Sequence, residues 1–182
     1  GVGAKDLILA IIGELGAAGA GYRAVELDGP GVAALSVEER ITMANMGIEM
    51  GAKVAAFPVD DQCAAYLESV GLARGSYEPL WADAGASYER ELSFALNDIE
   101  PVVALPPKVD RVVSVAEAKD LEIQQALLGT CTNGRLEDLQ SAADILRGRR
   151  IAPWVVSWPC VPNRMSTVGP TASRMLRSTA SV

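Results

Sequence analysis

The segment Gly129-Thr-Cys-Thr-Asn-Gly134 holds the residue types in this chain that are best suited to chemistry. It lies between an apolar stretch that predicts a strand over 123–128 and a pattern that predicts a helix over 135–146. Cys131 is therefore expected close to a helix N-terminus, where unpaired N–H groups and the helix dipole stabilise a thiolate. Such a thiolate is suited to nucleophilic attack or to ligation of a soft metal ion.

The neighbours of Cys131 support a polar loop. Thr132 and Asn133 add hydrogen-bonding groups, and Gly134 allows the backbone to turn sharply. The same position is, however, typical of a small buried cysteine packed at a strand end. Position alone leaves both interpretations open.

A second pattern is Asn45-Met-Gly-Ile-Glu49. Residues four apart on one helix share a face, so Asn45 and Glu49 are expected to lie together. Their apolar neighbours would leave the carboxylate partly desolvated and suited to acid–base or ligand chemistry. The alternative is a solvated glutamate near a helix C-terminus.

Composition narrows the classes of protein. The chain has 182 residues, 49% of them hydrophobic and 21% charged, which is typical of a globular protein and not of a disordered one. A net charge of −7 argues against a broad nucleic-acid surface. The lack of histidine excludes Ser-His-Asp, Cys-His and histidine-zinc chemistry within this chain.

The number and spacing of the cysteines, and the lack of targeting segments, indicate the expected cellular compartment. Three widely spaced cysteines do not make a disulfide scaffold, which favours a reducing, cytoplasmic setting. Neither a signal peptide nor an apolar segment long enough for a membrane span is predicted. Because no initiator methionine is present, we expect a piece of a longer protein.

The elements that must position these residues alternate between helix and strand. Apolar periodicity, the capping box Ser36-Val-Glu-Glu39 and a cap at Asp60 predict helices over 5–15, 36–50, 60–70 and 135–146, and strands over 22–27, 54–57 and 123–128. This order predicts an α/β fold of layered αβα type, with a mixed or parallel sheet and flanking helices.

Two boundaries are expected. The prolines of the connector that starts at Pro101 separate a first domain, 1–100, from the start of another, 101–153. Residues 154–182 have three arginines and no acidic residue, so an atypical tail, frameshifted or disordered, is expected there.

The whole segment 129–139, GTCTNGRLEDL, resembles the cluster-binding loop of the aconitase superfamily, especially the large subunits of 3-isopropylmalate dehydratase and homoaconitase. The segment 35–53, which contains Asn45 and Glu49, is similar to the Asn-Met-x-x-Glu region of that family. Shorter stretches at 3–9, 77–80 and 103–106 also resemble it. The resemblance covers about residues 1–153.

The resemblance implies a hydro-lyase that moves a hydroxyl group between adjacent carbons of a hydroxy di- or tricarboxylate. Cys131 would be one of three cysteines that hold a [4Fe–4S] cluster, whose open iron acts as a Lewis acid. Glu49 would help proton and hydroxyl transfer, and Asn45 would hydrogen-bond near the cluster or substrate. Thr132, Asn133 and Arg135 would shape the loop. A small, swivelling subunit is the implied partner.

The chain also departs from the family pattern. The other two cluster cysteines of the family form a Cys-x-x-Cys pair, which this sequence lacks. Residues 1–100 would match the family's second domain and 101–153 the start of its third. We therefore expect an incomplete and inactive piece of the enzyme. Two alternatives remain: a non-catalytic α/β module that binds a partner or a small acid, and a thiol enzyme that uses Cys131 without iron.

Overall fold

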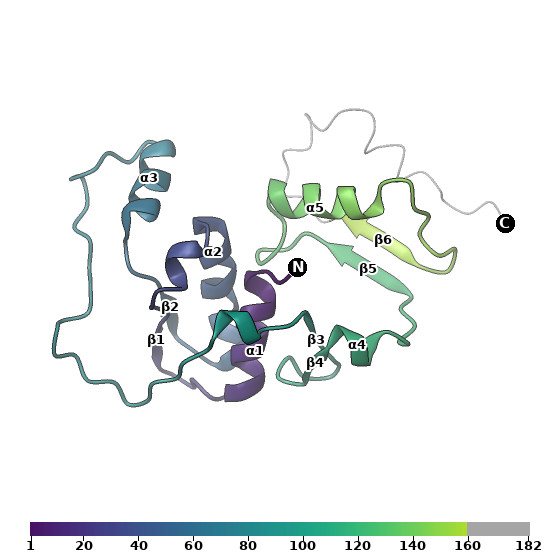
Figure 1. Ribbon diagram of the computed structural model, residues 1–182, viewed down its shortest axis with the longest axis horizontal. Helices are drawn as coiled ribbons and strands as arrows, with labels where there is room; N and C mark the ends of the chain where they lie inside the picture. The colour runs from purple at the N-terminus through teal and green to yellow at the C-terminus, as the bar shows by residue number, and fades with distance from the viewer. Residues whose placement is uncertain (160–182) are drawn as a thin grey trace. The chain divides into compact units, whose positions relative to one another are not determined.

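The computed structural model describes residues 1–159 and forms two compact units, divided between Glu122 and Ile123 (Figure 1). The first unit contains α1 Ala4–Leu15, β1 Ala24–Glu26, η1 Val32–Ala34, α2 Val37–Met46, η2 Gly47–Met50, β2 Val54–Ala56, α3 Asp61–Ser69, η3 Leu96–Asp98, β3 Val102–Ala104, β4 Val112–Ser114 and α4 Val115–Ala118. The second contains β5 Gln125–Leu128, α5 Leu136–Leu146 and β6 Val156–Pro159. Cys160 and most of the expected tail lie outside the described residues.

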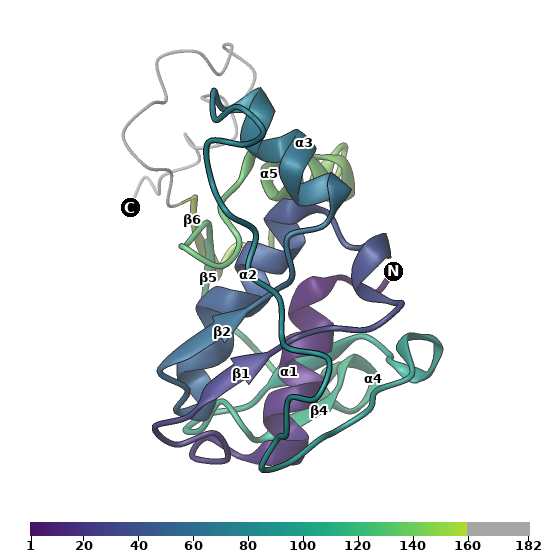
Figure 2. The same ribbon diagram turned by 90° about the vertical axis from the view of Figure 1, so that its left-hand side faces the viewer.

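The α/β class is confirmed, and its strands form three pairs. Parallel pairs join β1 to β2 and β5 to β6 (Figure 2), and β3 pairs antiparallel with β4 (Figure 1). In both parallel pairs the connection between the strands contains a helix, as a parallel crossover requires. The expected tail begins at residue 154, yet Val156–Pro159 forms β6. Within residues 1–159, the helices are too short or too polar to cross a membrane.

The core of the first unit is built on α1. Its apolar residues recur at helical spacing, and Ile8 and Ile12 are fully buried. Three methionines pack into the same cluster, Met43 and Met46 from α2 and Met50 from η2. Each fully buried side chain of this size contributes about 1.5–3 kcal/mol relative to exposure. This packing positions the segment that carries Asn45 and Glu49.

The β3–β4 hairpin also packs on α1, within the connector that was expected to separate two domains (Figure 1). Asp6 Oδ1 accepts a hydrogen bond from the Val102 N–H, and Asp110 Oδ2 accepts one from the Ala17 N–H, both at 2.9 Å. These contacts attach residues 101–114 to the first unit. The compact units therefore divide at 122/123, whereas the division at 100/101 stays a prediction about the domains of the family.

The predicted helix starts are confirmed by side-chain caps. Ser36 Oγ accepts from the Glu39 N–H at 3.2 Å, while Glu39 Oε2 accepts from the Ser36 N–H at 2.8 Å. Asp60 Oδ1 accepts from the Cys63 N–H at 2.9 Å and caps α3. These interactions are local in sequence, so the composition of each turn was sufficient to predict them.

Arg40 of α2 is a buried cation in the first unit, with only 4% of its surface exposed. Its guanidinium donates two hydrogen bonds to Asp60, at 2.8 Å to Oδ1 and 2.7 Å to Oδ2. Further hydrogen bonds go to the carbonyls of Val32 and Leu35 and to Gln62 Oε1. The Arg40 hydrogen bond holds the pKa of Asp60 below its usual value. The pair fixes the start of α3 against α2.

Asp60→Ala leaves Arg40 buried without its carboxylate, so we expect the free energy of unfolding to fall by about 3–5 kcal/mol at pH 7. The contribution of Asp60 is present above the unfolded pKa, about 4, and is lost as the pH falls through the lower folded pKa. The difference between wild type and variant should therefore narrow below about pH 4. Urea unfolding measured across this pH range tests both effects.

Asp61→Ala is the matched control, because the Asp61 side chain is 97% exposed and contacts Arg74 at 3.3 Å. It should change the free energy of unfolding by less than about 1 kcal/mol. Equal losses in the two variants, or a loss in Asp60→Ala that does not depend on pH, would contradict the role of the buried pair.

The second unit leaves many apolar side chains uncovered within 123–159. No residue of α5 is buried, and the exposed fractions are 59% for Leu127, 73% for Leu136 and 62% for Ile145. A parallel sheet is normally covered on both faces. Exposed apolar surface of this kind marks a site of association.

We therefore expect the chain to self-associate, with Leu136→Gln and Ile145→Gln weakening the association because they remove apolar contact area. Sedimentation velocity over a concentration series measures this. Leu80→Gln, at a position of the first unit that is 80% exposed, is the matched control and should have a smaller effect. A monodisperse monomer of the unaltered chain would contradict the prediction.

Candidate functional site

The loop between β5 and α5 turns back on itself before the helix begins. Gly129 has a left-handed φ of 99°, a conformation that side-chain-bearing residues rarely adopt. A Cβ atom on Gly134 would lie 2.8 Å from the carbonyl oxygen of Thr130. The two glycines therefore permit a closed turn with Cys131 inside it.

Within this turn Cys131 is exposed, and it precedes the first residue of α5, Leu136, by five positions. The expected position of the thiol close to a helix N-terminus is confirmed, and the alternative of a buried cysteine is wrong. The hydroxyl oxygens of Thr130 and Thr132 lie 2.9 Å apart in a hydrogen bond across Cys131. Thr132, Asn133 and Arg135 are half-buried. All four predicted loop residues thus occupy one short segment.

Asp138 is a loop-supporting residue that sequence reasoning missed. Its Oδ1 accepts from the Asn133 side-chain amide at 2.9 Å, and its Oδ2 accepts from the Arg135 N–H at 3.0 Å. Asp138 follows Arg135 by three positions, which is the spacing of the second residue of a capping box. That spacing could have identified it, although arginine is not a typical N-cap residue.

Asn45 and Glu49 belong to the first unit and lie on consecutive helical segments. Asn45 is in α2, whereas Glu49 is in η2, where the helix tightens to 3-10 geometry before Gly51 ends it with a left-handed φ of 83°. Both residues are exposed. Of the two interpretations of Glu49, the structure therefore supports the solvated carboxylate near the end of the helix, because the apolar neighbours Met46 and Met50 point into the core instead. Catalytic roles for both residues stay predictions.

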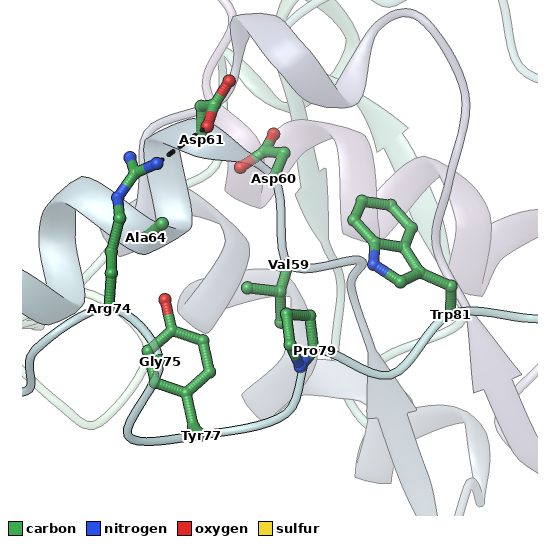
Figure 3. Close-up of a pocket in the computed structure, with 9 residues that line it drawn as sticks. All are labelled: Val59, Asp60, Asp61, Ala64, Arg74, Gly75, Tyr77, Pro79 and Trp81. Atoms are coloured by element: carbon green, nitrogen blue, oxygen red, sulfur yellow. Dashed lines mark hydrogen bonds and ion pairs between the residues drawn. The ribbon is translucent and has the colours of Figure 1, made fainter.

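A pocket of about 490 Å³ lies beside the start of α3 (Figure 3). Tyr77 and Trp81 line it together with Asp60, Asp61 and Arg74. Its charged groups already pair within the chain: Asp60 with Arg40, and Asp61 with Arg74 at 3.3 Å. None of the predicted site residues lines this pocket.

The side chains available as metal ligands decide which metal centre the described residues could hold. A [4Fe–4S] cluster is held by cysteine thiolates, typically four of them or three with one open iron. Residues 1–159 contain no group of three or more Cys, His, Asp or Glu side chains placed to hold a metal ion. Cys131, exposed on a closed turn, fits a single ligand of such a cluster. The remaining ligands would have to come from outside the described part of the chain.

The structure therefore defines this chain as an α/β protein. Its candidate site is an exposed cysteine in a strand–loop–helix turn that is bounded by two glycines. The family model for the aconitase family (aconitate hydratase) matches residues 1–166. The chain belongs to the aconitase family.

The sequences of individual aconitase-family proteins agree with this membership. The chain is 49% identical over 155 residues to the 3-isopropylmalate dehydratase large subunit of Nitratidesulfovibrio vulgaris (Miyazaki F), covering 85% of this chain and 36% of that protein. It is 47% identical over 148 residues to a probable methanogen homoaconitase large subunit of Methanosarcina mazei, covering 81% and 37%. It is 47% identical over 152 residues to the 2,3-dimethylmalate dehydratase large subunit of Eubacterium barkeri, covering 82% and 36%. The chain thus spans little more than a third of the length of these relatives.

We expect Cys131 to react with iodoacetamide at neutral pH several-fold faster than Cys63, because the Cys131 side chain is exposed whereas Cys63 is half-buried in α3. Peptide mapping after timed labelling of a Cys160→Ser variant measures both rates. Equal or slower labelling of Cys131 would contradict the greater accessibility of its thiol.

Proposed function

We propose that this chain is part of the large subunit of a hydro-lyase of the 3-isopropylmalate dehydratase and homoaconitase type. The family membership carries the proposal, together with the exposed thiol of Cys131 on the turn before α5. In this proposal residues 1–100 correspond to the second domain of the subunit and 101–153 to the start of the third.

Cys131 would supply one of three thiolate ligands to a [4Fe–4S] cluster. When bound, that cluster supplies an open iron that acts as a Lewis acid toward the substrate hydroxyl and carboxylate. Around Cys131, the glycines at 129 and 134 permit the turn, and the Asp138 hydrogen bonds hold it in one conformation. A loop that is held in one conformation would keep the Cys131 thiolate in the orientation that a metal centre requires.

Glu49 and Asn45 are the residues that would act on the substrate from the first unit. The Glu49 carboxylate is exposed and can accept or return a proton as the hydroxyl group leaves or re-enters. The Asn45 amide can both donate and accept hydrogen bonds to a bound hydroxy acid. Dehydration removes a proton and the hydroxyl group from adjacent carbons, and rehydration adds water with the opposite orientation.

The partners would be a small-molecule hydroxy di- or tricarboxylate and a small subunit. The relatives are named large subunits of 3-isopropylmalate dehydratase, homoaconitase and 2,3-dimethylmalate dehydratase, so the substrate class is a hydroxy acid with two or more carboxylates. With one cysteine ligand among residues 1–159, the chain alone should not dehydrate such an acid.

A chimera tests the proposal. The matching segment of the Nitratidesulfovibrio vulgaris large subunit is replaced by the matching 155 residues of this chain and produced with the small subunit of that organism. We expect dehydration of 3-isopropylmalate, followed by ultraviolet absorbance of the alkene product. Cys131→Ser should lower kcat by at least about 100-fold, because losing a ligand removes the metal centre that stabilises the transition state.

Cys63→Ser in the same chimera is the matched control. It should keep activity, because Cys63 lies within α3 and not in the loop that carries Cys131. Iron content should fall in the Cys131 variant and not in the Cys63 variant. Full activity of Cys131→Ser, in a chimera that folds and binds its small subunit, would refute the proposed function.

A further inference from the structure

Asp138 makes contacts that the family resemblance does not assign to it. We propose that Asp138 is the positioning residue of the Cys131 loop: it holds both the Asn133 side chain and the Arg135 backbone, and thereby aims the Asn133 carbonyl oxygen inward as a hydrogen-bond acceptor. The inference deepens the proposed function and rests on it for the meaning of the loop.

The orientation of Asn133 follows from donor and acceptor chemistry. An ionised carboxylate can only accept hydrogen bonds, whereas a side-chain amide has one donating and one accepting end. Because Asp138 Oδ1 lies 2.9 Å from Asn133 Nδ2, the NH2 end must face Asp138. The carbonyl end then faces the opposite way, and Asn133 Oδ1 is buried.

The buried oxygen has no partner among residues 1–159. Leaving a buried acceptor unsatisfied costs free energy, so native structures rarely keep one without a role. Cluster sulfides accept hydrogen bonds and cannot donate them, so a cluster alone would not satisfy this oxygen. The group that does so must carry an N–H or an O–H.

The second contact of Asp138 fixes the end of the loop. Its Oδ2 accepts from the Arg135 N–H at 3.0 Å, one of the backbone donors that a helix N-terminus leaves without an internal partner. One carboxylate therefore joins the loop to the first turn of α5 at two points. Because Gly134 has no Cβ atom, the backbone at Gly134 can approach the Thr130 carbonyl closely and the turn can form. The Asp138 hydrogen bonds then favour this conformation of the turn.

The neighbouring acid offers a matched control. Glu137 lies in the same first turn of α5, carries the same charge and is exposed. Glu137→Gln and Asp138→Asn each remove one negative charge near the helix N-terminus, so a general electrostatic effect should be equal in both. A positioning effect should appear only at 138.

The test is amide hydrogen exchange, followed by NMR on the full chain as it stands, for wild type, Asp138→Ala, Asp138→Asn and Glu137→Gln. We expect the Arg135 amide to exchange about tenfold faster in Asp138→Ala, since one hydrogen bond to a charged group is lost. Asp138→Asn keeps one oxygen acceptor and should have an intermediate effect. The Asn133 side-chain NH2 resonances should shift in both variants at 138 and stay in place in Glu137→Gln.

Confinement to the loop separates positioning from simple helix capping. If Asp138 only stabilised α5, exchange would accelerate along 136–146 as well, and the Asn133 NH2 signals would not move selectively. That pattern, an equal effect of Glu137→Gln, or unchanged exchange in both variants at 138 would overturn the inference. No cluster is needed for the measurement, so it can succeed or fail independently of the chimera.

Discussion

The apolar face of α1 is the constraint on which the first unit depends. Ile8 and Ile12 are fully buried on it, and α2, η2, β3 and β4 all contact this helix or share its cluster. Because Met43, Met46 and Met50 turn toward α1, the residues between them that remain exposed include Asn45 and Glu49. The core thus determines which polar side chains of the Asn45–Glu49 segment are exposed.

In the second unit the corresponding constraint is the turn between β5 and α5. A side chain at 134 would collide with the Thr130 carbonyl, and the Asp138 carboxylate joins Asn133 to the start of the helix. These local contacts shape the turn, while the apolar residues of α5 stay uncovered within 123–159. A preformed Cys131 loop on an incompletely covered unit agrees with a chain that spans little more than a third of the length of its relatives.

Local chemistry explains what the sequence could predict. The Ser36–Glu39 capping box, the Asp60 cap and the spacing of α1 each depend on residues within one or two turns, and the structure confirms them. The attachment of the β3–β4 hairpin depends on Asp6 and Asp110, which bond to backbone groups more than 90 positions away. Such contacts have no local signal, so the compact units divide 22 residues later than the expected boundary at 100. The spacing of Asn45 and Glu49 left the burial of Glu49 open for a related reason, since burial depends on which neighbours turn inward.

We propose that Cys131 is a ligand of an iron–sulfur centre in an aconitase-type large subunit. The most direct measurement is an anomalous-scattering map at the iron edge, from crystals of the chimeric large subunit grown without oxygen. We expect a peak of iron density bonded to Cys131 Sγ, with further cysteine ligands from the relative's part of the chain. An iron centre whose ligands are all contributed by the relative's segment, with Cys131 Sγ turned away from it, would contradict the ligand role of Cys131.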